Sequence, residues 1–138
     1  MKHTARIGLS VAAMMLAAAC GGSGGGGSLT NPTPPTTGGS ANPSTATITI
    51  GADGRVSPAT GAVAPGGRVT FINNHTQAHD MSSDPHPEHT QCPEINQVGF
   101  LSAGQQRTTG NLNTVRSCGF HDHNLPENQG LQGRIVIQ

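Results

Sequence analysis

Cysteine and histidine crowd one short segment near the end of the chain, Cys118-Gly-Phe-His121-Asp-His123. A soft thiolate beside imidazoles suits copper or zinc, whereas sets of carboxylates suit calcium or magnesium. Another histidine, His79, lies far upstream. These residue types predict a transition-metal site to which His79, Cys118, His121 and His123 contribute ligands.

Other histidines lie close to these in the sequence. His86 and His89 follow His79 on a proline-rich stretch. A lone histidine is more often a solvated surface residue than a ligand, but clustering in two short segments favours ligation. We expect His79 and His121 to bind the metal and His123 to supplement them. The roles of His86 and His89 stay open.

The N-terminal segment carries signals for export. Lys2 and Arg6 form a basic start, and an apolar run from Ile7 to Ala19 ends in small residues. This pattern predicts a secretory signal peptide over residues 1–19. Cleavage would leave Cys20 first, which resembles the lipobox of bacterial lipoproteins and predicts lipidation of Cys20. Cleavage by the ordinary signal peptidase, giving a soluble exported protein, is the alternative.

The segment after the signal peptide reads as a lipid-anchored linker. Residues 20–44 are rich in Gly, Ser, Thr, Asn and Pro, a composition that predicts a flexible tether. Several acyl chains on Cys20 would give a stable anchor. Gly21 follows, instead of the Asp that resembles an inner-membrane retention signal. We therefore expect a bacterial envelope protein on the outer membrane, facing the periplasm, with no other membrane contact.

Residues 45–138 are long enough for one domain with a modest core. When Lys2 and Arg6 leave with the signal peptide, five Arg remain against seven acidic residues, a formal charge of −2. The domain has no basic field, and Trp and Tyr are absent, so we expect no nucleic-acid partner. No set of residues for nucleophilic or carboxylate-pair catalysis is visible, so we do not expect an enzyme.

The domain reads as a series of short strands. Ala46 to Ile50 alternates with period two, Val115 to Phe120 is the expected penultimate strand, and Gly133 to Ile137 closes the chain. Asp84 to Asn96 is a long, proline-rich excursion of the kind that is often functional. Short strands between Gly/Pro turns, with no sustained helical period, predict an all-β Greek-key β-sandwich.

The order of these motifs resembles the cupredoxins. The motifs are the turn Ala64-Pro-Gly-Gly before Val69-Thr-Phe-Ile, then His79, Leu101-Ser-Ala-Gly-Gln, Cys118-x-x-His121 and Gly133-Arg-Ile-Val-Ile. The resemblance covers most of residues 46–138. It implies a cupredoxin-like sandwich in which an upstream His, a loop Cys and a loop His bind one copper and pass single electrons. By position these ligands would be His79, Cys118 and His121, with Leu131 standing where an axial Met is expected.

Cys92 and Cys118 leave alternatives open. In an exported protein a cysteine is normally either paired or bound to metal. A free Cys118 predicts a one-electron copper carrier with an unidentified redox partner protein in the envelope. A Cys92–Cys118 disulfide would contribute roughly 3 kcal/mol and leave copper to imidazoles, as in a non-redox copper-binding or copper-handling module. A metal-free interaction module is the third alternative.

Overall fold

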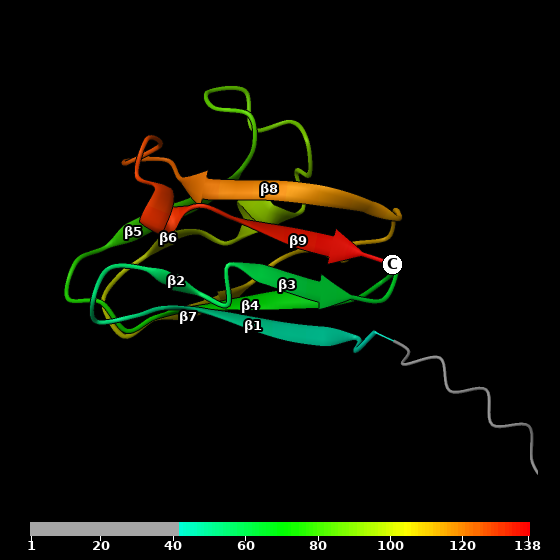
Figure 1. Ribbon diagram of the computed structural model, residues 1–138, viewed down its shortest axis with the longest axis horizontal. Helices are drawn as coiled ribbons and strands as arrows, with labels where there is room; N and C mark the ends of the chain where they lie inside the picture. The colour runs from blue at the N-terminus through cyan, green and yellow to red at the C-terminus, as the bar shows by residue number, and fades with distance from the viewer. Residues whose placement is uncertain (1–41) are drawn as a thin grey trace, which may run out of the picture. The chain divides into compact units, whose positions relative to one another are not determined.

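The computed structural model describes residues 42–138, which form two β-sheets packed face to face (Figure 1). The predicted signal peptide, Cys20 and the linker as far as residue 41 lie outside the described residues. No helix in the described part of the chain is long and apolar enough to cross a membrane.

The two sheets hold all the strands of the described region. The four-stranded sheet has the order β2 (Val56–Ser57), β1 (Thr45–Ile50), β4 (Arg68–Asn73) and β7 (Gln106–Thr108). The five-stranded sheet has the order β3 (Thr60–Val63), β9 (Gly133–Ile137), β8 (Arg116–Asp122), β5 (His79–Ser83) and β6 (Gly99–Leu101). The short 3₁₀ helices are η1 (Ile95–Gln97) and η2 (Gln129–Leu131). The predicted all-β sandwich is confirmed.

Alternation along the strands builds the core. Successive side chains of a strand point to opposite faces of its sheet. In β4, Val69 and Phe71 are both fully buried, whereas Arg68 is exposed. Phe71 meets Phe120 of β8 edge to face, with ring centroids 5.1 Å apart, which joins the two sheets through an aromatic contact.

Strand β8 continues past the predicted end at Phe120. It pairs with β9 on one side and with β5 on the other, where Ser82 lies opposite His121 and Met81 opposite Asp122. His121 and Asp122 therefore belong to a strand and not to a loop. Their side chains consequently point to opposite faces of the five-stranded sheet.

The excursion after β5 projects above β8 in Figure 1 and returns through η1 to β6. It begins where the backbone N–H of Asp84 donates to the carbonyl of Gly119 in β8, at 3.1 Å. It is also tied down by the Ser83 hydroxyl, which accepts from the backbone N–H of Cys92 at 2.8 Å. The segment from Asp84 to Cys92, hereafter the excursion loop, is thus anchored at both ends to the β5–β8 pair.

Candidate metal centre

Cys92 and Cys118 are joined by a disulfide, with their Cα atoms 5.9 Å apart. The two cysteines are 26 positions apart in the sequence, and both are fully buried. Cys118 lies inside strand β8 and on its core face, not in a loop. A paired sulfur offers no thiolate, so the expectation that Cys118 is a copper ligand is wrong for this structure. The alternative that pairs the two cysteines is the one the structure contains.

His79, the expected upstream ligand, is buried on the core side of β5, with 1% of its surface exposed. Its Nδ1 lies 2.7 Å from Asp122 Oδ2 and its Nε2 lies 2.9 Å from Nδ1 of His75. The other carboxylate oxygen of Asp122 accepts backbone N–H bonds from the residues at 80 and 124. Both ring nitrogens of His79 therefore already have partners.

The predicted grouping of His79 with His121 does not form. His79 shares the core face with Asp122, whereas His121, the residue before Asp122, points to the opposite face of the same sheet. The sheet itself therefore separates the two imidazoles that the resemblance to cupredoxins would bring to one copper.

A different set of histidines meets on the outer face of β8. We call His86, His89, His121 and His123 the histidine quartet. One ring nitrogen from each of His86, His89 and His123 lies within 4.8 Å of the other two. The ring centroid of His121 lies 5.1 Å from that of His89 and 5.5 Å from that of His86. The excursion loop thus supplies two imidazoles, the end of β8 supplies His121, and the turn directly after β8 supplies His123.

The spacing of one pair within the histidine quartet fits a metal ion. His123 Nδ1 and His89 Nε2 are 3.2 Å apart, a hydrogen-bond distance, so a metal ion bound by both would replace this bond. Two imidazole nitrogens on a tetrahedral ion with bonds of about 2.0–2.1 Å would be separated by roughly 3.3 Å. The four side chains offer only imidazole nitrogens, which are suitable ligands for copper, zinc or nickel.

His121 carries an unsatisfied nitrogen in this site. The residue is 2% exposed, and its Nδ1 lies 2.6 Å from Asp84 Oδ1. Its Nε2 is buried and has no hydrogen-bond partner among the described residues. An unsatisfied buried polar atom costs about 1–3 kcal/mol, and such atoms are rare in folded proteins. A metal ion coordinated by Nε2 would remove that cost.

His89 is held in place by its backbone. It has a φ of 51°, in the left-handed region that residues other than glycine seldom adopt. Its N–H donates to the carbonyl of Pro85 at 2.7 Å, and the side-chain amide of Asn96 donates to its carbonyl at 2.9 Å. Unusual backbone conformations of this kind concentrate at functional sites.

The surroundings of His89 favour its neutral form, which is the form that binds metals. Burial lowers the pKa of His89, and repulsion from the other three members of the histidine quartet lowers the pKa further. Asp80 raises the same pKa, as the smallest contribution. A neutral imidazole presents a lone pair to a metal ion, whereas a protonated one does not.

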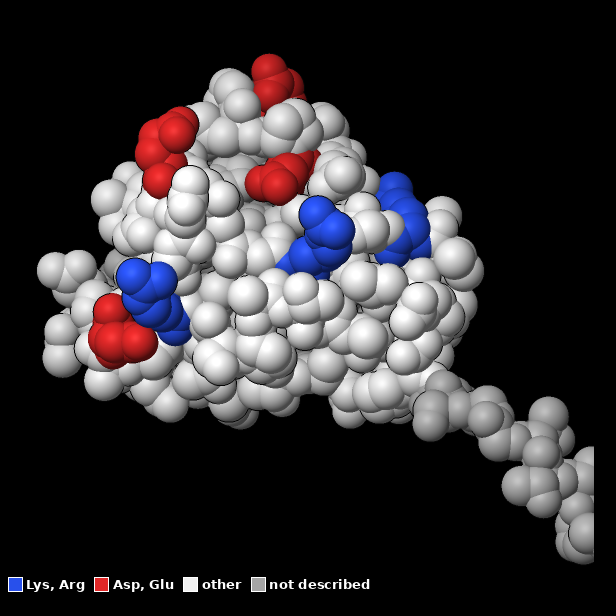
Figure 2. Space-filling view, viewed as in Figure 1, with Lys and Arg blue, Asp and Glu red and all other residues white. Residues whose placement is uncertain are grey.

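Acidic side chains surround this end of the molecule. In Figure 2 most of the red surface lies on and around the projecting excursion loop, which contains Asp84 and Glu88. Most of the blue arginine surface lies lower, over the sheets. Negative charge around a cleft raises the local concentration of cations, so the electrostatic environment suits the approach of a metal ion.

The sequence left His86 and His89 open because nothing in it gives the direction of their rings. The available signal was their spacing, three apart, on a loop already expected to be functional. His121 and His123 lie in the histidine quartet, as two members of the predicted ligand set. Leu131, at the place expected for an axial ligand, is buried in the core.

No protein-family model matches this sequence, and no curated protein is significantly similar to it. Solved structures are similar in fold. A novel purple cupredoxin from Nitrosopumilus maritimus has a TM-score of 0.52 at 17% identity, covering 67% of this chain and 99% of its own. Oxidised plastocyanin from Dryopteris crassirhizoma has a TM-score of 0.52 at 15% identity, covering 67% and 99%. Reduced auracyanin from Roseiflexus castenholzii has a TM-score of 0.52 at 15% identity, covering 71% and 99%.

This protein therefore has the cupredoxin fold, as its sequence motifs indicated. Sequence identities this low establish the fold alone. The likeness does not extend to the expected ligands, because Cys118 is paired and His79 is bonded to Asp122. Within the described residues, the ligand atoms close enough to share a metal ion belong to His86, His89 and His123, and the ring of His121 lies beside them.

Proposed function

We propose that this protein binds one copper ion through the histidine quartet. The observation that carries the proposal is His121, whose buried Nε2 has no partner among the described residues and whose ring lies beside those of His86 and His89. Among divalent first-row metals, copper(II) binds nitrogen ligands most tightly. The fold similarity to copper proteins points to the same metal. Each of the four side chains would coordinate the bound copper through one ring nitrogen.

An all-imidazole site differs from the thiolate site of a blue-copper protein. The intense visible absorption of a blue site requires a sulfur-to-copper bond, and the disulfide removes Cys118 from that role. The protein is then best described as a copper-binding or copper-handling module of the envelope, without a catalytic role of its own.

Titration of the oxidised, metal-free exported protein with copper(II) tests this proposal. We expect binding of one copper per chain, with a pale spectrum, no intense thiolate band and no free thiol at Cys92 or Cys118. His121→Ala should abolish the tight site, while His75→Ala, outside the histidine quartet, should leave it intact. Absence of stoichiometric copper would favour a metal-free interaction module. Equal affinity in wild type and His121→Ala would also contradict the proposal.

A one-electron carrier is the second candidate. Its support is the likeness of the fold to a plastocyanin and an auracyanin, together with ligands placed partly on a rigid strand, β8. One imidazole on the strand, His121, and a second directly after it, His123, would limit the rearrangement that accompanies a change in copper charge. A reversible copper couple in voltammetry is expected of a carrier, and an irreversible one would exclude this role. A carrier would also need a redox partner protein in the envelope.

The location of the protein is a separate proposal. The sequence of residues 1–44 supports a signal peptide, a lipid on Cys20 and a tether that places the metal site in the periplasm. Mass spectrometry of the mature protein from an envelope fraction should detect an acylated Cys20. An unmodified N-terminus produced by ordinary signal-peptide cleavage would overturn the lipid anchor and leave an exported soluble protein.

A further inference from the structure

We infer that Asp84 is the positioning residue of this site: its carboxylate holds His121 with the proton on Nδ1, so that the Nε2 lone pair faces the histidine quartet. The inference rests on the proposed function for its consequence in copper binding. The tautomer and ring orientation of His121 can, however, be measured without metal.

The contact between Asp84 and His121 determines which nitrogen is free. Asp84 Oδ1 lies 2.6 Å from His121 Nδ1, and an ionised carboxylate can only accept a hydrogen bond. The neutral ring must therefore carry its proton on Nδ1, which leaves Nε2 as the acceptor. That Nε2 is the buried atom without a partner. Metal-binding histidines commonly have this arrangement, in which a carboxylate fixes the ring from behind.

The chain also makes room for this carboxylate. Gly119 of β8 lies beneath Asp84, and a Cβ at Gly119 would collide with Asp84 Oδ2. Any other residue at this position would displace the carboxylate from its place behind His121. The absence of a side chain at position 119 thus leaves space for the carboxylate that contacts the ring of His121, two residues further along the strand.

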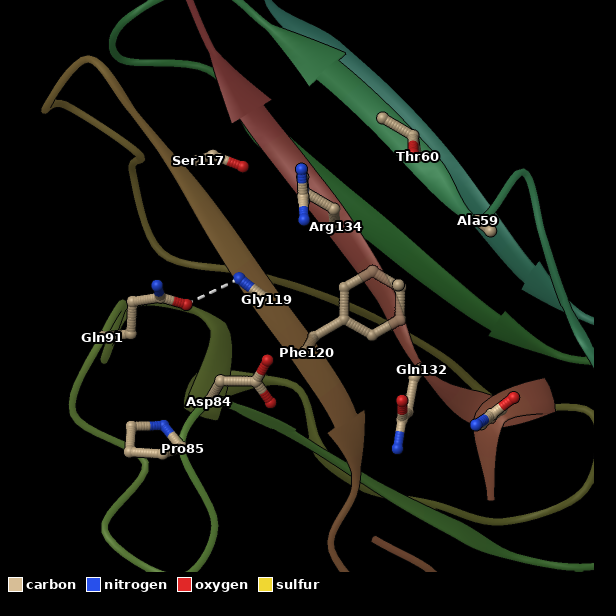
Figure 3. A pocket seen from close by; sticks show the side chains of 12 residues that line it. Ala59, Thr60, Asp84, Pro85, Gln91, Ser117, Gly119, Phe120, Gln132 and Arg134 are labelled. Carbon is tan, nitrogen blue, oxygen red and sulfur yellow. Dashed lines mark hydrogen bonds between the residues drawn. The ribbon is translucent and has the colours of Figure 1, made fainter. Parts of the chain in front are cut away.

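A neighbouring amide holds the same piece of backbone. Gln91 Oε1 accepts from the backbone N–H of Gly119 at 2.7 Å. Figure 3 shows this bond and, on the same side of β8, the carboxylate of Asp84 beside Gly119. Asp84 and Gln91 come from opposite ends of the excursion loop. Together they fix the position of the loop, and with it the carboxylate, relative to β8.

Asp84 lies between the buried ring and solvent. Its side chain is 44% exposed and lines an open groove of about 810 Å³ over β8 and β9, whereas the His121 side chain is 3% exposed. Asp80 gives a useful contrast. Its charge also acts on His89, but its carboxylate makes no hydrogen bond to a histidine of the described chain. Replacing Asp80 with Asn therefore measures the effect of removing a nearby negative charge alone.

The first test is made on the metal-free exported protein. Two-bond proton–nitrogen NMR correlations identify which ring nitrogen carries the proton. We expect the Nδ1–H form for His121 in wild type, and its loss in Asp84→Ala. Asp84→Asn should retain it, because the amide oxygen can still accept from Nδ1. An Nε2–H form in wild type, or no change in Asp84→Ala with the fold intact by circular dichroism, would overturn the inference.

The second test measures copper(II) affinity in the same variants. Loss of a carboxylate behind a metal-bound histidine typically weakens binding about 10–100-fold, and we expect this for Asp84→Ala. Gly119→Ala should also weaken binding and shift the His121 tautomer, although it removes no polar group. Asp80→Asn, the matched control for charge, should change affinity much less than Asp84→Ala.

The two tests separate the inference from the proposed function. If wild type binds no copper but its His121 has the Nδ1–H form that depends on Asp84, the proposed function fails and the positioning role stands. If wild type binds copper, and both Asp84→Ala and Gly119→Ala bind copper as tightly as wild type does, the positioning role fails and the proposed function stands. If Asp80→Asn weakens copper binding as much as Asp84→Ala does, the effect of Asp84 comes from its charge alone. That result would contradict the inference.

Discussion

The two faces of the β5–β8 pair each carry a histidine bonded to a carboxylate, and they differ in what the second ring nitrogen does. On the core face, His79 is bonded to Asp122 through Nδ1 and to His75 through Nε2. On the outer face, His121 is bonded to Asp84 through Nδ1, and its Nε2 has no partner. The same chemical pair thus forms a closed cross-link in one place and an available ligand in the other.

The comparison shows how a buried histidine can be classified. A histidine whose two nitrogens are both satisfied contributes to stability, because any metal would have to displace a hydrogen bond already made. A histidine held by a carboxylate on one side and left unsatisfied on the other carries a cost that a ligand relieves. By this measure His79 stabilises the fold, and His121 is a candidate metal ligand.

Replacing His79 and His121 separately with alanine should give the largest difference between the two faces. His79→Ala removes one partner of a buried pair, for which the expected cost is about 3–5 kcal/mol in unfolding free energy, with copper affinity little changed. His121→Ala should remove tight copper binding with a smaller loss of stability. Urea denaturation and copper titration of both variants measure these effects. Loss of copper binding in a folded His79→Ala protein would contradict the division between the two faces.

Removing the disulfide should lower both the stability of the fold and the affinity for copper. A Cys92→Ser, Cys118→Ser double variant is expected to lose about 2–5 kcal/mol of stability, the usual cost for a native disulfide. Because Cys92 ends the excursion loop that carries His86 and His89, copper should also bind more weakly. Thermal unfolding and copper titration test this, with wild type in a reducing agent as the parallel measurement. Tighter binding of copper with an intense visible band in a single Cys92→Ser variant would revive Cys118 as a ligand.

Acid should lower the stability of the metal-free protein through His89 of the excursion loop. The pKa of His89 is lowered in the folded state, so between that value and its ordinary 6.5 the unfolded chain binds more protons. Stability of the metal-free protein should therefore be present above pH 6.5 and decline as the pH falls through the lowered value. Denaturation across this pH range measures the decline.

His89→Asn is the matched variant for that experiment, because asparagine tolerates the positive φ but does not titrate there. The decline in stability with falling pH should be shallower in this variant. Identical pH profiles for wild type and His89→Asn would show that His89 does not contribute to the acid sensitivity.

The smallest effect is expected at His75. This residue is only partly buried and contributes one hydrogen bond to His79. His75→Ala should cost about 0.5–1.5 kcal/mol and leave copper affinity unchanged, since no metal ligand contacts it. Parallel denaturation and titration provide the values. A loss of copper binding in this variant would mean that the core-face histidines take part in the metal centre.

Much of the fold was predictable from the sequence, because period-two strands and Gly/Pro turns mark the sandwich locally. The site was only partly predictable. The expected end of β8 at Phe120 placed His121 in a loop, where it could have joined Cys118. The strand continues instead, and residues three apart in a strand point to opposite faces. Cys118 therefore enters the core, and His121 faces the excursion loop.

The ligands on the excursion loop could not be predicted for a different reason. The directions of His86 and His89 depend on the conformation of a proline-rich loop, including a left-handed residue at position 89. No periodic pattern encodes such a conformation. By contrast, knowledge of the strand boundary would have separated the core from the outer face. The odd spacing of Cys118 and His121 would have placed them on opposite faces, and the even spacing of His121 and His123 would have placed those two on the same side.

The most direct test is to locate the copper by anomalous diffraction from crystals of the protein loaded with one equivalent of copper(II). The account predicts a single strong peak among the rings of His86, His89, His121 and His123, with the Cys92–Cys118 disulfide intact and His79 still bonded to Asp122. A peak at His79, or one bonded to a free Cys118 sulfur, would contradict it.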